Sequence, residues 1–497
     1  MTREILIETL SGETRLAILE DGELMELYSE RAGSEKLSGN IYAGRVENVL
    51  PGMNAAFVDI GLDKNAFLYA GDIQLDSRDA QELASQLNAV RIQKMVHPGQ
   101  QVLVQVVKEP GGSKGPRISG HVTLPGRLTV LLPTVRYAGV SRRIENEEER
   151  GRLREIAVRL ARDAGAGLIV RTAAQGASEE ELARDFEALL RLWQTIQTRG
   201  AHVAAPALLH RDESLVYRAV RDMLTPEVAA IKTDDAGICQ QLLENARLLA
   251  PELADKITLS ENQTPLFDIY RIDALAEKAM QRRVWLKSGG YLVFDYAEAL
   301  TVIDVNTGKY VGKHSLSDTV FQTNCEAAKE IARQLRLRDI GGIIVIDFID
   351  MEAPEQRQEL LNQLREYLRY DRTRTNLAGI TSLGLVEMTR KKVRQPVHKL
   401  SSHICDVCQG TGMVPSYETV ARAILRDLRR RAAAGSEGAL LVTASAPVAT
   451  TLWEMDAPPG VRAFVTASES LAGSEYTITA AQENALPPKT RQLKESD

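Results

Sequence analysis

The sequence predicts a multidomain protein of mixed α/β and α+β architecture. With 497 residues, the chain is long enough for about three or four domains of ordinary size. Short strands separated by glycine turns begin near residue 38 and are typical of a small barrel, whereas later segments mix buried strands with helices. Hydrophobic residues make up 44% and charged residues 26%, which is ordinary for a globular protein.

Charge and hydropathy exclude several classes of protein. The net charge of −6 argues against a simple polycationic binder, so any affinity for nucleic acid must come from local patches. The N-terminal segment MTREILIETLSGETR carries charges where a signal peptide needs an apolar core, and no apolar run approaches the ~20 residues of a membrane span. We therefore expect a cytoplasmic protein. Four cysteines in so long a chain are not a disulfide framework.

The first strands cannot form a core alone. Residues 1–37 read as a strand pair with a hairpin turn at Asp21-Gly22. Residues 217–280 read as helix, strand and helix, and they carry no obvious chemistry. We expect the two segments to pair and to make one domain that two insertions split.

The first insertion, residues 38–120, resembles the S1 RNA-binding module, a version of the OB-fold. The resemblance rests on Gly44-Arg45-Val46, Leu50-Pro51-Gly52, Ala55 to Gly61 and Ala66-Phe67-Leu68. Phe57 and Phe67 are candidates for stacking RNA bases, worth about 1–3 kcal/mol per base, and Lys114 is a candidate phosphate contact. The alternative for each Phe is core packing, which the sequence alone favours. Residues 74–97 look like a polar, partly helical insertion in the barrel.

The second insertion, residues 121–216, mixes strands and helices around a candidate anion site. A buried strand that starts at Gly167 ends in Arg171 and Thr172. An arginine and a hydroxyl at a strand end suit an anion, because the guanidinium offers a forked set of donors to phosphate. The alternative for Arg171, and for Arg142 nearby, is an ordinary salt bridge with the many acids in this segment.

In residues 281–400, two hydrophobic runs each deliver one carboxylate. Asp304 lies in a run with the two-residue period of a strand, and Asp347 follows an uninterrupted apolar run typical of a strand buried on both faces. Neighbouring carboxylates suit Mg²⁺, which takes one or two protein carboxylates and substrate phosphate oxygens. We therefore predict a Mg²⁺-dependent phosphodiesterase with Asp304 and Asp347 as ligands and Asn306 as a donor to the scissile phosphate. The alternative is that each Asp only caps a helix or starts a turn.

Two basic segments accompany the carboxylates. A helix over 317–338 places Lys329, Arg333 and Arg336 at helical spacing on one face, near where RNA phosphates would lie. The segment MTRKKVRQPVHK concentrates five cations, which are Arg390, Lys391, Lys392, Arg394 and Lys399. In an acidic protein such a run suggests a nucleic-acid contact, and a solvated face is the alternative.

A cysteine pair with metal-ligand spacing, Cys405 and Cys408, lies in the segment SSHICDVCQGTG. Structural zinc takes four ligands, commonly thiolates, and Cys239 and Cys325 lie far off in helical contexts. One solution is a Cys₄ site shared by two chains, which would tie dimerisation to the metal. A redox CxxC is an alternative, although the expected thioredoxin-like βαβ setting is absent, and His403 is an open candidate for a third ligand.

Taken together, these stretches resemble the ribonuclease E/G family over nearly the whole chain, and its ribonuclease G branch most. The most specific motifs are Ser288-Gly289-Gly290, Glu298 to Asn306, Asn324 to Asp350, Gly384 to Arg390 and Cys405 to Gly412. We expect no tail of the long disordered, arginine-rich kind with which ribonuclease E scaffolds a degradosome. It departs from the family at Asp406, where many relatives have proline, and in the 74–97 insertion.

The resemblance implies an architecture for each segment. It implies a ribonuclease H-like domain split by an S1 barrel and a 5′-sensor domain, then a deoxyribonuclease I-like catalytic domain, a zinc link and a small α/β domain. The boundaries are 1–37 with 217–280, 38–120, 121–216, 281–400, 401–414 and 415–497.

The resemblance also implies an activity, cleavage of single-stranded, AU-rich RNA that favours 5′-monophosphorylated ends and leaves 5′-phosphate and 3′-hydroxyl products. It assigns Mg²⁺ to Asp304 and Asp347, the scissile phosphate to Asn306, and a Zn²⁺ link between protomers of a homodimer or tetramer to Cys405 and Cys408. The implied 5′-phosphate pocket is Val130, Arg142, Arg171 and Thr172, and the implied RNA contacts of the barrel are Phe57, Phe67 and Lys114.

Maturation of ribosomal RNA 5′ ends, transfer RNA processing and messenger RNA decay all fit such an enzyme. Two readings of a different class stay open from the sequence. In the first, the chain is a non-catalytic S1-type RNA-binding protein in which Asp304 and Asp347 are structural. In the second, it is a zinc-linked assembly protein.

Overall fold

The computed structural model describes residues 2–31, 36–73, 91–110, 114–308, 316–393, 396–397, 402–434, 438–471, 473–482 and 486–495. The chain divides into two units, residues 1–400 and 401–497. Along the described residues, no helix combines the length and the apolar character needed to cross a bilayer.

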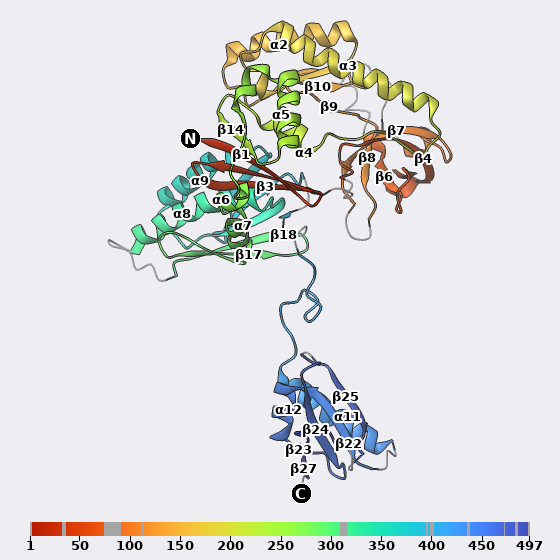
Figure 1. Cartoon of the computed structure of the whole chain (residues 1–497), viewed down its shortest axis with the longest axis vertical. Helices are drawn as coiled ribbons and strands as arrows, with labels where there is room; N and C mark the ends of the chain where they lie inside the picture. Colours follow the sequence, from red (N-terminus) through yellow and green to blue (C-terminus); the bar gives the residue numbers. More distant parts are fainter. Residues whose placement is uncertain are drawn as a thin grey trace. The chain divides into compact units, whose positions relative to one another are not determined.

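The N-terminal strands of the first unit share a sheet with a segment more than two hundred positions later (Figure 1). The strand order is β15-β14-β1-β2-β3. The bounds are β1 (Arg3–Leu10), β2 (Glu13–Glu20), β3 (Glu23–Arg31), β14 (Val228–Thr233) and β15 (Ile257–Leu259). β1 pairs in parallel with β14, so Ile5 lies opposite Ile231. We call this the split sheet.

Helices cover the split sheet on both faces. Ile5, Ile7, Leu16 and Ile18 pack with α4 (Leu215–Arg218) and α5 (Ala236–Leu249), whereas alternate residues such as Leu6 and Leu19 pack with α6 (Leu266–Ile269) and α7 (Ile272–Met280). The predicted hairpin turn is confirmed, because Asp21 and Gly22 have positive φ angles of 49° and 79° and join β2 to β3.

A closed five-stranded barrel follows the split sheet's first strands, and β4 closes it by pairing with both β5 and β7. Its strands are β4 (Ile41–Leu50), β5 (Ala55–Asp59), β6 (Ala66–Tyr69), β7 (Gln101–Lys108) and β8 (Arg117–Ser119), and β13 (Ala207–His210) pairs with β4 from outside. Of the predicted 74–97 insertion, positions 74–90 lie outside the described residues, and Ile92 and Val96 belong to the barrel core.

A smaller four-stranded sheet, in the order β11-β12-β10-β9, packs against two long helices. Its elements are β9 (Leu124–Pro125), β10 (Thr129–Leu132), β11 (Ala138–Val140), β12 (Gly167–Val170), α2 (Glu147–Ala164) and α3 (Glu179–His202). A capping box of Ser178 and Glu181 starts α3.

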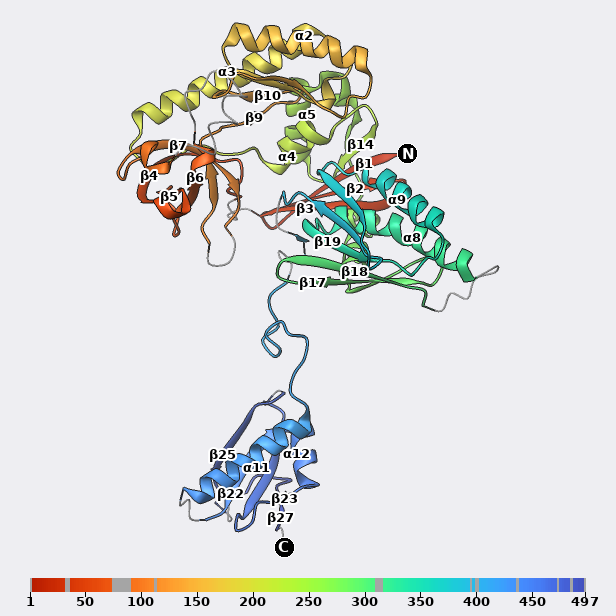
Figure 2. The ribbon, with the colours of Figure 1, turned by 180° about the vertical axis from the view of Figure 1, so that it is seen from behind.

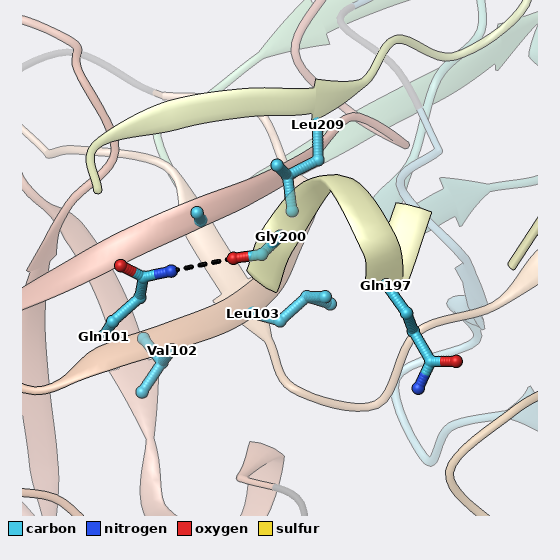
Figure 3. Close-up of a pocket in the computed structure, with 7 residues that line it drawn as sticks. Gln101, Val102, Leu103, Gln197, Gly200 and Leu209 are labelled. Carbon is cyan, nitrogen blue, oxygen red and sulfur yellow. Dashed lines mark hydrogen bonds between the residues drawn. The ribbon is translucent and has the colours of Figure 1, made fainter. Parts of the chain in front are cut away.

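The end of α3 docks on the barrel around a cavity of about 320 Å³ (Figure 3). The side-chain amide of Gln101 donates to the Gly200 carbonyl at 3.1 Å. A Cβ at position 200 would lie 3.2 Å from Leu209, so glycine allows the helix to approach this closely. The contact ties the barrel to the helical insertion.

The sheet that carries both candidate carboxylates has the order β16-β17-β18-β19-β21-β20, and we call it the catalytic sheet. Its strands are β16 (Arg283–Trp285), β17 (Tyr291–Tyr296), β18 (Leu300–Asn306), β19 (Gly342–Asp347), β20 (Thr375–Ile380) and β21 (Val386–Arg390). One face forms a single hydrophobic core with α8 (Leu316–Leu337) and α9 (Pro354–Leu368) (Figure 2). That core contains alternate strand residues such as Leu292, Ile303 and Ile346.

Charged side chains of α8 attach this layer to the split sheet. Arg336, only 4% exposed, lies 2.9 Å from Glu20 and 2.7 Å from Glu26, and Arg333 donates to the Leu24 carbonyl at 2.9 Å. The prediction of an RNA-facing cationic side is therefore wrong for Arg333 and Arg336. Of that trio, only Lys329 is exposed.

The second basic segment is also partly structural. Arg390 is buried between Asp339, at 2.6 Å, and Asp371, at 2.7 Å, so the predicted nucleic-acid contact is wrong for this residue. Lys391 and Lys392 are exposed. Arg394 and Lys399 lie outside the described residues.

The second unit is a small α/β domain with a sheet in the order β25-β22-β24-β26. Its elements are α11 (Tyr417–Ala433), β22 (Leu440–Ser445), α12 (Ala446–Trp453), β23 (Asp456–Ala457), β24 (Ala463–Ser468), β25 (Tyr476–Ala480), β26 (Arg491–Gln492) and β27 (Lys494–Glu495). Both helices contribute to one core with β22 and β24. Ser416 caps α11.

The buried Glu26 predicts acid sensitivity of the first unit. Burial opposes ionisation, but Arg336 and Arg372 outweigh it and lower the pKa of Glu26 from 4.5 to about 2. A lowered folded-state pKa gives stability that is present above the unfolded-state pKa and is lost as the pH falls through the folded-state pKa. We expect the free energy of unfolding in urea to fall between about pH 4.5 and pH 2, and Glu26→Gln to flatten that fall. The exposed control Glu155→Gln should leave it unchanged, and identical pH profiles for all three proteins would contradict the assignment.

Candidate active site

The pairing of β18 with β19 brings the two candidate carboxylates together. The strands run parallel, and Asp304 is the register partner of Asp347. The side-chain amide of Asn306 donates to Oδ2 of Asp304 at 2.7 Å. Because Ile303, on the same strand, points into the core, the polar residues at alternate positions lie on the opposite face. The face away from α8 and α9 thus holds a carboxylate pair and an amide.

The electrostatics of this face suit a hard cation. Partial burial and the negative charges of Asp304 and Asp350 raise the pKa of Asp347 above its usual range. Such mutual repulsion is relieved when a divalent cation binds between the oxygens. Among the residues that the structure describes, no group of three or more His, Cys, Asp or Glu side chains gathers around a common point. Two protein carboxylates still fit Mg²⁺, which keeps several waters and binds substrate oxygens.

A buried amide on α8 holds the chain just beyond Asp347, and the sequence analysis gave it no role. Asn324 donates to the Ile349 carbonyl at 2.8 Å and accepts from the Ile349 N–H at 3.1 Å. This double hydrogen bond fixes the backbone that leaves β19. The sequence does mark this residue, because Asn324 is a polar residue inside the apolar stripe of a helix, next to Ala327, Ala328 and Ile331.

The predicted RNA contacts of the barrel lie outside its core. Phe57 and Phe67 are cross-strand partners, with ring centroids 6.2 Å apart in an edge-to-face arrangement. The residues that alternate with them belong to the core and are Ala56, Val58, Ala66 and Leu68. Both rings are half-buried, so the core-packing alternative is wrong.

Lys114 lies close to the same strand. It is exposed and precedes β8, which pairs with β6. The next residue must be glycine, because a Cβ at position 115 would meet the Asn65 carbonyl at 2.1 Å. The close approach holds Lys114 beside the strand that carries Phe67.

The predicted 5′-phosphate pocket is assembled in part. Val130 on β10 pairs with Ile169 on β12, and Arg171 follows β12 directly. Arg171 lies 2.8 Å from Asp222 and also donates to the Gly126 carbonyl, so the salt-bridge alternative holds for this side chain.

The other two pocket residues lie at the exposed end of the same strands. The Thr172 hydroxyl hydrogen-bonds that of Ser141 at 2.9 Å, next to Arg142 in the chain. Arg142 is exposed and has no ion pair within the described ranges. Arg142 and Thr172 are therefore the groups best placed to meet an anion.

The cysteine pair forms a compact knuckle in the second unit. Gln409 donates its N–H to the Cys405 carbonyl at 2.8 Å, and Gly410 and Gly412 have positive φ angles of 86° and 72°. The N–H groups of Gly412 and Gly410 and the Cys405 thiol lower the pKa of Cys408. A lowered pKa favours the thiolate that metals bind.

The other two cysteines belong to the first unit. Cys239 is part of α5 and Cys325 part of α8, where burial raises the pKa of the Cys325 thiol to about 11. His403 is exposed. In the described stretches, no group of three or more His, Cys, Asp or Glu side chains that could hold a metal ion is found.

Comparison with known proteins yields two family matches. Residues 123–393 match the model of the Ribonuclease E/G family. Residues 404–481 match a model described as the RNase E/G thioredoxin-like domain, which corrects the expectation that a thioredoxin-like setting is absent. The cysteine pair nevertheless precedes α11, which begins at Tyr417, and so does not occupy a helix N-terminus.

Individual proteins are similar over most of the chain. Ribonuclease G of Escherichia coli strain K12 is 42% identical over 453 residues, which cover 91% of this chain and 92% of that protein. Ribonuclease G of Haemophilus influenzae is 43% identical over 428 residues, 86% and 87% of the two chains. Ribonuclease E of a Nostoc species is 42% identical over 400 residues, 80% of this chain and 57% of that protein.

Proposed function

The chain belongs to the ribonuclease E/G family, and we propose that it is an endoribonuclease that hydrolyses RNA at the Asp304–Asp347 pair. The observation that carries the proposal is the in-register pairing of these carboxylates on a face free of the core. Two acidic residues held this rigidly, with a raised pKa for Asp347, fit a Mg²⁺ site.

The side chains of this face have distinct roles in the proposed reaction. When bound, Mg²⁺ supplies Lewis-acid polarisation of the phosphate and activation of water for in-line attack. Asp304 and Asp347 hold the cation, and the Asn306 amide, which already donates to Asp304, has a second N–H for the scissile phosphate. Asn324 keeps the backbone after Asp347 in place. The expected products carry 5′-phosphate and 3′-hydroxyl ends.

The proposed substrate is single-stranded, AU-rich RNA. The outward Phe57–Phe67 pair offers bases a stacking surface, and Lys114 offers a phosphate contact. A 5′-monophosphate would bind at Arg142 and Thr172, with Arg171 behind them. We expect the enzyme to act in the cytoplasm in ribosomal RNA 5′-end maturation, transfer RNA processing and messenger RNA decay.

We further propose that Cys405 and Cys408 bind Zn²⁺ together with the same pair from a second copy of the chain. The lowered pKa of Cys408 and the two glycine turns support a thiolate knuckle. Four thiolates from two protomers would complete a tetrahedral structural site and link a homodimer.

The first prediction concerns the carboxylates. We expect internal cuts in 5′-monophosphorylated AU-rich RNA with Mg²⁺ and none with EDTA. Asp304→Asn and Asp347→Asn should each lower kcat by about 10²-fold or more, the size of effect seen when one electrostatic group is removed from a transition state. The exposed Asp163→Asn should cut at the wild-type rate. RNA binding without cleavage by the wild type would support a non-catalytic RNA-binding protein instead.

The second prediction concerns the 5′ end. Arg142→Ala should slow cleavage of 5′-monophosphorylated RNA by about 10- to 150-fold, because a hydrogen bond to a charged group contributes about 1.5–3 kcal/mol. Arg171→Ala should act in the same direction. Cleavage of 5′-hydroxyl RNA should not change, and Arg154→Ala is the matched surface control. Equal slowing of both RNAs would exclude a role in 5′-phosphate binding.

The third prediction concerns the metal link. Treatment with a strong zinc chelator should convert the dimer into monomers on size-exclusion chromatography with light scattering, and Cys405→Ser should do the same without chelator. Cys239→Ser, which changes a cysteine of the first unit, should remain dimeric. An unchanged mass after chelation would show that zinc does not link the protomers.

A further inference from the structure

A row of side chains continues from the candidate active site to the edge of the catalytic sheet. Trp285 on β16 is the partner of Tyr291 on β17, and Tyr291 is the partner of Asn306 on β18. In the adjacent row, Arg283 and Val293 lead to Asp304. Opposed residues in a ladder point to the same face, so Trp285, Tyr291 and Arg283 share the face of the carboxylates. We call these three residues the aromatic platform.

The aromatic platform is separate from the hydrophobic core. Val284 and Leu292, which alternate with its members, are buried in the core against α8 and α9. Trp285 is 53% exposed, although burying this side chain would give a large hydrophobic gain. An exposed indole in line with candidate catalytic groups therefore points to a ligand with flat apolar surfaces.

The rings and the cation form one surface. The Trp285 and Tyr291 ring centroids are 5.2 Å apart. The Arg283 guanidinium lies 4.6 Å from the Tyr291 centroid and 5.9 Å from that of Trp285. Arg283 forms no ion pair with any residue in the described part of the chain. Its charge thus remains available to an anionic ligand, which a buried ion pair would prevent.

The distances from the carboxylates to the aromatic platform suit the nucleotides next to a phosphate bound at Asp304 and Asp347. Neighbouring strands lie about 4.8 Å apart, so Tyr291 is about 5 Å and Trp285 about 10 Å from β18. Successive stacked bases repeat at about 3.4 Å along one strand. The aromatic platform is therefore long enough for one or two nucleotides beside the scissile phosphate.

We propose that the aromatic platform stacks the bases of single-stranded RNA on one side of the scissile phosphate, with Arg283 contacting the backbone. The inference rests on the proposed ribonuclease function and extends it to a second stacking surface, distinct from the barrel pair Phe57 and Phe67. Aromatic faces, an exposed cation and continuity with the carboxylates favour RNA over a protein partner.

The test is equilibrium binding of a short fluorescent single-stranded oligoribonucleotide in EDTA, where no cleavage occurs. Trp285→Ala should weaken binding by about 5- to 150-fold, the range that stacking of one base spans. Trp285→Phe, which keeps an aromatic face, should retain most of the affinity. Tyr370→Ala is the matched control, because Tyr370 is 52% exposed at the end of α9 and should leave the affinity unchanged.

Abasic nucleotides placed one at a time along the same oligonucleotide identify the stacked position. At one position, removal of the base should weaken binding to the wild type but not to Trp285→Ala, because the stacking partner is already lost in that variant. Equal affinities of the wild type and Trp285→Ala would overturn the aromatic platform even if Asp304→Asn abolishes cleavage. If Trp285→Ala binds RNA more weakly but the wild type does not cleave it, only the nuclease proposal would be refuted and the aromatic platform would stand.

Discussion

The parallel pairing of β18 with β19 is the constraint on which the candidate active site depends. The register sets Asp304 opposite Asp347, and a slip of one residue would turn Asp347 into the core and expose Ile346. Burial of Ile303 and Ile346 against α8 and α9 makes that slip costly, because each buried aliphatic side chain contributes about 1.5–3 kcal/mol. The apolar face of the sheet thus fixes the geometry of the polar face. On the other side of β18, its antiparallel pairing with β17 and that of β17 with β16 place Asn306, Tyr291 and Trp285 in one row.

Helix α8, which connects β18 to β19, has three structural roles. Parallel neighbours need a crossover, usually a helix, and α8 is that crossover. It covers the core face of the catalytic sheet, and its Asn324 holds the backbone after Asp347. Its far end carries Arg336 into the acidic pair of the split sheet. Removing one partner of such a buried cluster typically costs about 3–5 kcal/mol. The helix that joins the strands of Asp304 and Asp347 is thus also anchored to the N-terminal strands.

Hydrophobic patterns in the sequence predicted the two strands that carry Asp304 and Asp347, because such patterns are properties of single strands. The two-residue period around Asp304 describes β18 correctly, and the apolar run before Asp347 does form a strand, β19. The expectation that this strand is buried on both faces is wrong, because its residues alternate in burial and Ile343 is 51% exposed. The ion-pair partners of Arg336, Arg390 and Arg171 were not predictable in this way, because Glu20, Asp339 and Asp222 lie elsewhere in the chain. A cation at helical spacing looks the same whether solvent or a distant carboxylate faces it.

For the two phenylalanines of the barrel, the hydrophobicity of the side chain and the two-residue alternation of the strand predict different positions. Hydrophobicity alone assigns Phe57 to the core, but its neighbours Ala56 and Val58 occupy the interior. Alternation along the strand decides the outcome, because Ala56 and Val58 point into the barrel and the residue between them points outward. Outward rings on a barrel and an exposed indole on the edge of the catalytic sheet are then two instances of one physical situation. In both, alternation along a strand places the core on one face and leaves an aromatic surface on the other. An exposed aromatic surface of this kind is one on which the bases of a single-stranded nucleic acid stack.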